Sequence, residues 1–221
     1  MRKIIMVCLG IALMLSAGQA GAQPIYSQSE FTTAESLDPG MTQTGVQFSL
    51  GDHYRNYYPE IRYGMGGMLE FGIKFGATSI TFLDPNPDPN ANHKGLNGDK
   101  LGALVGIDLK YQLVKETDGI PIDLAVDLGW DNTIINEMNA SEVSFNTIVS
   151  KSFPLTDRGY KFIPYGGLGM ASLTGSLPHD SGTAVTVFGG IEWKLSQKFM
   201  FLLEFKTGHG TLGGAGIRFE Y

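Results

Sequence analysis

The sequence has a single cysteine, Cys8, and few charged residues. Charged side chains make up 17% of the chain, against roughly 25% in ordinary soluble domains. Acids outnumber bases, so the net charge is -6. This balance leaves no basic patch of the kind that nucleic-acid-binding proteins need, and we expect no nucleic acid as a partner. With one cysteine near its start, the rest of the chain has no disulfide, thiol nucleophile or thiolate metal site.

A hydrophobic run long enough for a membrane helix is also missing. The apolar stretch 4–15 has about a dozen residues, whereas a spanning helix needs about 20. Arg2 and Lys3 precede this stretch, and the small residues of 20–22 follow it. The pattern is typical of a signal peptide that is cleaved before Gln23. We therefore expect residues 1–22 to direct export and to be removed, taking the lone cysteine with them. No lipobox surrounds that cysteine, so a lipid anchor is not expected.

What the sequence does have is alternation of apolar and polar residues with a period of two, which is typical of β-strands. Several of the runs are about 10 to 13 residues long, more than the 5 to 6 usual in globular proteins and close to the 9 to 11 of a tilted membrane strand. They predict an all-β, closed antiparallel transmembrane β-barrel of about ten strands, with eight as the alternative. The clear runs are 69–77, 101–113, 120–130, 185–195, 199–206 and 215–221, and the weaker ones are 41–50, 57–63, 141–153 and 161–174.

The connections between these runs also alternate in length, as short periplasmic turns and longer external loops do in barrels. Residues 41–221 then form one barrel domain, and residues 23–40 are a polar lead-in of uncertain structure. The expected periplasmic turns are 64–67, 114–118, 154–160 and 196–198. The expected external connections are 51–56, 83–98, 131–140, 175–183 and 208–210.

Alternation alone does not separate a membrane barrel from a periplasmic β-sandwich, because either fold has one apolar and one polar face. The positions of the aromatic residues favour the barrel. They fall near strand ends, where barrels carry aromatic girdles at both membrane interfaces. The external girdle residue is Trp130, and the periplasmic ones are Tyr63, Tyr111, Phe153, Trp193 and Tyr221.

Opposite charges recur along the polar face of the predicted strands, mostly two residues apart and so on one side of a strand. On a wet surface such pairs contribute about 0–1 kcal/mol each. In a narrow barrel the same side chains would interlock across the lumen and fill it. The pairs are Glu60/Arg62, Glu70/Lys74, Asp108/Lys110, Glu192/Lys194, Glu204/Lys206 and Arg218/Glu220.

The final run resembles the terminal-strand signal by which assembly machinery recognises outer-membrane barrels. In that pattern a glycine precedes hydrophobic residues at alternating positions and the strand ends on an aromatic. Gly216, Phe219 and Tyr221 match the pattern, and Gly214 stands where a polar residue is usual.

Taken over 41–221, the chain resembles the small bacterial outer-membrane β-barrel proteins of the OmpA/OmpX/OmpW-like class, also described as the outer membrane protein beta-barrel domain class. The resemblance implies a place in the cell outer membrane. It also implies outer-membrane lipids and the barrel assembly machinery as partners, and it makes extracellular ligands at the loops a further candidate. It carries no family-specific functional motif.

Catalysis is an alternative that the loops leave open. Some outer-membrane barrels are hydrolases: omptin proteases use Asp and His at the external rim, and lipid A deacylases use His and Ser. The histidines of this chain lie in no sequence context that matches either of these families, and the metal-binding spacings H-x-x-x-H and H-E-x-x-H are absent. We therefore expect no enzyme, no cofactor and no metal site. All four histidines fall in the expected external loops: His53, His93, His179 and His209.

Transport is the other alternative. Eight-stranded barrels are filled by their side chains, whereas sixteen strands or more leave a channel. At about ten strands, the inward charges together with Leu104, Phe188, Met200 and Leu202 would fill much of the lumen. The sequence therefore predicts a narrow, charge-filled barrel with a structural or surface-interacting role rather than a general porin. A small gated channel remains the alternative.

Overall fold

The structure is a computed structural model that describes residues 30–51, 54–82, 98–116, 119–136, 138–155, 160–175, 182–208 and 210–221. Nearly all of these residues belong to β-strands, and none forms a helix long and apolar enough to cross a membrane. The strands are β1 (Thr42–Gly51), β2 (Tyr54–Gly66), β3 (Leu69–Phe82), β4 (Gly98–Val114), β5 (Asp123–Ile135), β6 (Met138–Ser150), β7 (Phe153–Pro154), β8 (Lys161–Gly175), β9 (Gly182–Lys194), β10 (Phe199–Thr207) and β11 (Thr211–Glu220).

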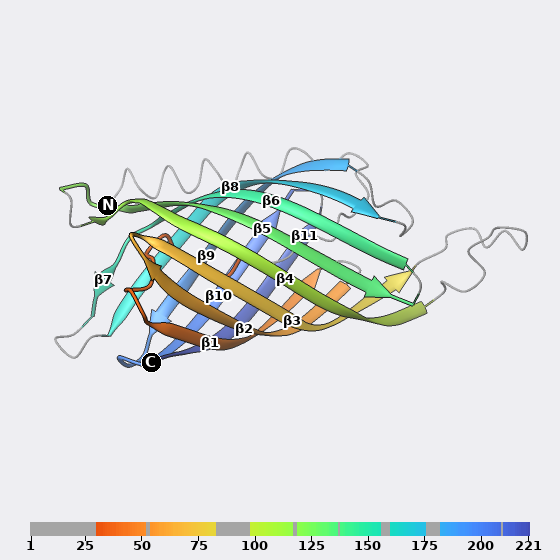
Figure 1. The fold of residues 1–221 in the computed structure, drawn as a ribbon, viewed down its shortest axis with the longest axis horizontal. Helices are drawn as coiled ribbons and strands as arrows, with labels where there is room; N and C mark the ends of the chain where they lie inside the picture. The colour runs from red at the N-terminus through yellow and green to blue at the C-terminus, as the bar shows by residue number, and fades with distance from the viewer. Residues whose placement is uncertain are drawn as a thin grey trace, which may run out of the picture.

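The strands close into one antiparallel barrel (Figure 1). Each long strand pairs with the next along the chain, β6 pairs with β8, and β1 pairs with β11 to close the ring. The wall therefore has ten strands, and the two-residue β7 pairs with the start of β8. The predicted all-β barrel is confirmed. The alternative of a two-sheet sandwich is wrong, because the ladder continues around the ring instead of dividing into two sheets.

The barrel has two different ends. The start of β1 and the end of β11 lie at one end, together with the turns 67–68 and 195–198; we call this the terminal end (left in Figure 1). We call the opposite end the loop end. There the external connection expected at 131–140 is much shorter, because β5 continues to Ile135 and the chain reverses at Asn136, whose φ is 56°. The polar residues that suggested a loop belong instead to a strand with a polar inner face.

The two faces of the wall are inverted relative to a water-soluble protein. Along β5, burial alternates strictly, with polar Asp123, Asp127 and Asp131 buried and apolar Leu128 exposed. An exposed apolar exterior around a buried polar interior is stable when the surroundings are apolar too, since the outer face then meets lipid. The exterior includes Val46, Ile61, Ile73, Phe75, Leu101, Ile107, Val143, Phe145, Leu168, Met170, Val185, Leu203 and Phe205.

The aromatic residues expected in the girdles all have exposed side chains on this exterior. Trp130 was expected at a strand end, but it lies five residues before the end of β5, because that strand continues to Ile135. The others lie toward the terminal end: Tyr63, Tyr111, Phe153, Trp193 and Tyr221. Their role as an interfacial girdle stays a prediction.

The chain does not leave the barrel before β1 but folds back into it. Asp38 to Met41 form a turn in which the Met41 N–H donates to the Asp38 carbonyl at 3.0 Å. Pro39 and Gly40 occupy its two central positions, and Gly40 has φ +82°, which matches a type II turn. Residues 30–38 lead into this turn, and we call them the luminal segment (red to orange in Figure 1). Phe31 to Ala34 are buried inside the barrel, whereas Asp38 is exposed where the turn begins. The expected signal peptide lies outside the described residues.

Candidate functional site: the filled lumen

Arg62 is the hub of the charges inside the barrel. Its Nε atom donates to Glu60 at 2.8 Å and one terminal nitrogen to Asp108 at 2.7 Å. The other terminal nitrogen contacts Glu70 and also donates to the Thr32 hydroxyl, at 3.2 Å. The Arg62 side chain is 2% exposed. Three carboxylates therefore share one buried guanidinium, whose fork of five N–H donors suits this arrangement.

The other buried cations pair across strands. Lys110 and Glu70 lie opposite each other on neighbouring strands. Arg218 and Glu60 lie two strands apart and meet over Gly45, and Lys74 and Asp131 meet in the same way over Gly106. Glu60–Arg62 is an ion pair within one strand, as expected. The cations of the other expected pairs form ion pairs with residues of other elements. These ion pairs are Arg218–Glu60 at 2.6 Å, Lys74–Asp131 at 2.9 Å, Lys110–Glu70 at 3.0 Å, Lys206–Glu30 at 2.8 Å and Lys194–Glu220 at 3.7 Å. The structure also places Glu192 and Glu204 on the inner face, both buried.

Glu204 anchors the start of the luminal segment. Its two carboxylate oxygens accept the backbone N–H groups of Glu30 and Phe31, at 2.8 and 2.7 Å. The hydroxyl of Tyr165 donates to the same carboxylate at 3.0 Å. Lys206, two residues along β10, binds the Glu30 side chain. One strand thus holds both the backbone and the side chain at the deep end of the segment.

Side chains of other strands hold the rest of the segment. The backbone N–H groups of Ala34, Ser36 and Leu37 donate to Ser150, Gln112 and Glu70, at 3.0 to 3.1 Å. The Lys110 ammonium donates to the Thr33 and Glu35 carbonyls and to the Thr32 hydroxyl. In every one of these contacts a side chain of the wall meets the segment. The segment is therefore docked in the lumen as a separate piece rather than built into the sheet.

Two inward glycines leave room for the segment. A Cβ atom on Gly214 would lie 2.2 Å from the ring of Phe31, which is fully buried. A Cβ atom on Gly64 would lie 2.2 Å from the carbonyl oxygen of Asp38. No real side chain tolerates such approaches, so the segment fits because these wall positions have no side chain.

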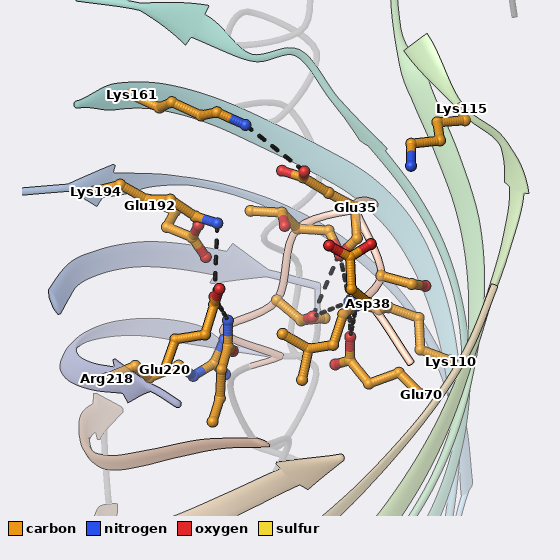
Figure 2. Close-up of a pocket in the computed structure, with 15 residues that line it drawn as sticks. Glu35, Asp38, Glu70, Lys110, Lys115, Lys161, Glu192, Lys194, Arg218 and Glu220 are labelled. Atoms are coloured by element: carbon orange, nitrogen blue, oxygen red, sulfur yellow. Dashed lines mark hydrogen bonds and ion pairs between the residues drawn. The ribbon is translucent and has the colours of Figure 1, made fainter. Parts of the chain in front are cut away.

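A cavity of about 220 Å³ opens beside the luminal segment toward the terminal end. Figure 2 shows charged side chains of both signs around it, with Glu35 of the segment 3.7 Å from Lys161 on β8. Lys115 also lines the cavity. The remaining charged lining residues are Asp38, Glu70, Lys110, Glu192, Lys194, Arg218 and Glu220.

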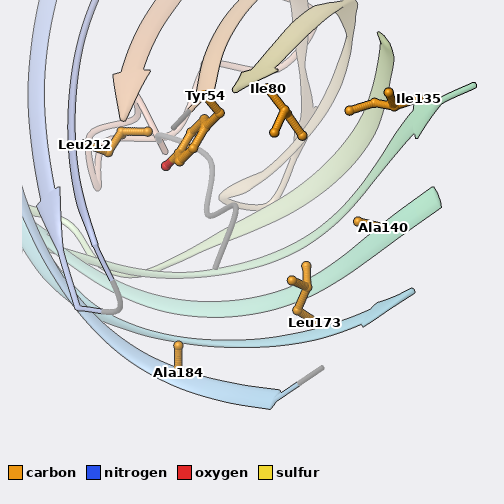
Figure 3. Packing of buried hydrophobic residues seen from close by; sticks show 7 residues of the cluster. All are labelled: Tyr54, Ile80, Ile135, Ala140, Leu173, Ala184 and Leu212. Atoms are coloured by element: carbon orange, nitrogen blue, oxygen red, sulfur yellow. The ribbon is translucent and has the colours of Figure 1, made fainter. Parts of the chain in front are cut away.

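At the loop end the inner face becomes apolar. Side chains from seven strands point inward around the ring (Figure 3), and all are buried. We call this set the apolar collar. It sits next to the loop end because each member lies within two residues of the end of its strand there: Tyr54, Ile80, Ile135, Ala140, Leu173, Ala184 and Leu212.

On the inner face of the wall, β5 and β6 carry carboxyl groups with oxygens that could accept further hydrogen bonds. Asp127, Asp131 and Glu142 each have one buried side-chain oxygen to which no donor among the described residues is bonded. Asp131 and Glu142 are direct cross-strand partners, and Asp127 lies next to Asn146. We call the three acids the acidic stripe. Like charges placed side by side repel each other, so this stripe favours a cation nearby.

The expected apolar fillers, Leu104, Phe188, Met200 and Leu202, are buried on the inner face. Leu104 and Leu202 share a cluster with Phe31 of the luminal segment. All four histidines lie outside the described residues, and within the described part of the chain no three His, Cys, Asp or Glu residues come together in a way that could hold a metal ion.

One polar contact at the terminal end lies outside the spanning strands. The Lys151 ammonium donates to Glu116 at 2.9 Å. This hydrogen bond lowers the pKa of the Glu116 carboxyl, which is partly exposed. The pair joins the connection after β4 to the one after β6.

No family model and no curated protein matches the chain. Solved structures with a similar course of the chain are barrels. The N-terminal β-barrel domain of Pseudomonas aeruginosa OprF is 12% identical, covers 84% of this chain and 100% of its own, and has a TM-score of 0.38. The β domain of the Bordetella autotransporter BrkA is 10% identical over 82% and 98%, with a TM-score of 0.47. The KdgM porin is 7% identical over 80% and 98%, with a TM-score of 0.39.

The geometry of this chain itself defines its class. A closed ten-strand wall, an apolar exterior and a polar, ion-paired interior are the features of a transmembrane β-barrel. Its architecture resembles that of small bacterial outer-membrane barrels, as the terminal strand and the alternating runs had indicated.

Proposed function

We propose that this protein is an integral outer-membrane β-barrel that is closed at rest, with a structural or surface-interacting role rather than that of a general porin. The filled lumen carries the proposal. Arg62 and its three carboxylates bridge the interior, and the luminal segment occupies the space beside them. A general porin keeps an aqueous channel along its axis.

The proposal includes export by the predicted signal peptide, and insertion by the barrel assembly machinery through Gly216, Phe219 and Tyr221. Phe219 and Tyr221 lie on the exterior at the terminal end of β11, where such a contact is accessible. The proposal assigns no catalysis, cofactor or metal. Ligands at the external loops would be the partners of a surface-interacting role.

Membrane fractionation and gel migration test the location. The protein should be recovered in the outer-membrane fraction, and in detergent its unheated form should migrate differently from the heated one. Recovery in the soluble periplasm would contradict the proposal. Planar-bilayer recordings test closure: the unmodified protein should be silent, whereas large, steady conductance would show a general porin.

A further inference from the structure

We propose that the luminal segment is a displaceable plug, and that the path it closes conducts small cations. This inference rests on the proposed function, because it assumes a barrel that is closed at rest. It adds a transport activity to that barrel and names the element that blocks it.

The way the segment is held supports displacement. The wall strands pair by continuous backbone ladders, whereas the segment is fixed by wall side chains such as Glu204, Ser150 and Lys110. Releasing it breaks none of the ladder hydrogen bonds. Elements with few backbone ladder contacts open at a lower free energy than the strands around them. The type II turn at Pro39 and Gly40 provides a defined hinge between the segment and β1.

The position of the segment supports a blocking role. Phe31 is packed in the middle of the lumen among Tyr58, Leu104 and Leu202. Ala34 is packed against the opposite wall, with Ile148 and Phe188. The segment therefore packs against strands on both sides of the lumen, and a cavity lies beside it toward the terminal end.

The charge of the inner wall sets the expected selectivity. Nine buried carboxylates face five buried cations on the strands that the structure describes, so the wall is acidic. Within the part of the chain that the structure describes, no donor is bonded to one oxygen of each acid in the acidic stripe. A narrow passage lined by one sign of charge concentrates ions of the other sign and repels its own. Small inorganic cations are therefore the expected cargo, with K⁺ as the probe.

The decisive variant lacks residues 30–38. If it still shows the heat-dependent gel shift, the wall has formed without the segment. We expect it to conduct in planar bilayers, with K⁺ permeating at least about threefold better than Cl⁻ in a KCl gradient. Replacing two acids of the stripe in that background, by Asp127→Asn and Glu142→Gln, should lower the preference for K⁺.

Gly64→Ala is a milder variant that keeps the whole segment. The new Cβ would collide with the backbone of Asp38 and Leu37, which belong to the segment. Gly213→Ala is the matched control, since a Cβ there meets no atom within 4 Å. A Thr33→Cys reporter should react slowly with a water-soluble maleimide in the parent and in Gly213→Ala, and faster in Gly64→Ala. Mapping the label to a peptide that contains position 33 confirms that the reporter is the residue modified.

Each outcome decides the proposal. A folded deletion variant that stays silent would overturn it, because the apolar collar or the ion network would then be the barrier. Preference for Cl⁻, or none, would overturn the cation path. If the deletion variant does not fold, the segment is a structural support of the barrel and not a displaceable plug. Fast labelling of Thr33→Cys in the parent would show that the segment is not bound in the lumen, and this would also overturn the proposal. The proposed function fails separately, if the unmodified protein itself conducts as a general porin or is soluble.

Discussion

The ring of Phe31 lies against the backbone of Gly214, so closely that a Cβ on the glycine would be 2.2 Å from the ring. The two residues are far apart in sequence, one at the start of the luminal segment and one in the last strand. Gly214 also occupies the position at which the terminal-strand signal usually has a polar residue. The contact explains the departure: the wall gives up a side chain there so that an aromatic ring can fill the lumen.

Phe31 and Gly214 should therefore be energetically coupled. Phe31→Ala leaves a cavity, which for a buried phenylalanine costs about 3–5 kcal/mol. Gly214→Ala overpacks the site and costs about 1–3 kcal/mol. In the double variant the new methyl group no longer meets the ring, although it still lies 2.9 Å from the Phe48 carbonyl oxygen. The combined cost should therefore be below the sum by about 1 kcal/mol. Urea unfolding in detergent measures all three, and strict additivity would show that the ring does not rest on Gly214.

We expect Glu30 to be a stronger ion-pair partner of Lys206 than Glu204 is. Lys206→Ala leaves the buried Glu30 carboxylate without its 2.8 Å ion pair, and breaking such a pair costs about 3–5 kcal/mol. Adding Glu30→Gln should recover part of this loss, because the uncompensated charge is then gone. Adding Glu204→Gln should recover less, since the Glu204 carboxylate also accepts two backbone N–H groups and a tyrosine hydroxyl. Equal recovery by both second substitutions would contradict the assignment.

Arg62 should not be replaceable by lysine. Three carboxylates surround its guanidinium, which reaches each of them through a different nitrogen. A lysine ammonium is a point charge and does not reach all three carboxylates at once. Arg62→Lys should therefore destabilise the barrel by about 2–5 kcal/mol. The temperature at which the gel shift occurs in detergent should fall clearly. Lys115→Arg is the control, because Lys115 is an exposed residue at the mouth of the cavity, and it should leave that temperature unchanged.

The strands were predictable because lipid and lumen impose opposite polarity on alternate residues. The run 101–113 has this alternation and lies within β4. Residues 131–135 were expected in a loop, since Asp, Asn and Thr are common there. The barrel instead turns Asp131 and Thr133 into a polar lumen, while Ile134 faces outward. Composition alone did not reveal this, but the alternation of burial continues through the segment.

The luminal segment was not predictable from periodicity, because it pairs with no strand and so has no period. Its signals were local. Asp38-Pro39-Gly40-Met41 contains the residues of a type II turn, which indicates a reversal before β1. The ion-pair partners of the charged residues were not predictable either. The spacing along the chain showed which charged residues share the inner face, but the register between strands decides that Lys74 contacts Asp131.

Tyr221 should matter more for assembly in the cell than for the finished fold. Tyr221 is 60% exposed on the exterior, and its hydroxyl donates to Thr44 at 3.3 Å. Its backbone pairs with Thr42 at 2.9 and 3.0 Å, and Tyr221→Ala keeps these two hydrogen bonds. Little packing is lost in Tyr221→Ala, so refolding from urea into detergent should be nearly unchanged. If assembly machinery reads the terminal strand, the amount of assembled barrel in the outer membrane should fall. Tyr111→Ala is the matched control, since Tyr111 is 44% exposed on the exterior in β4 and should assemble normally. Equal loss with both variants would mean that exposed aromatic rings serve the membrane interface in general, and equal yield with both would leave Tyr221 without a role in recognition.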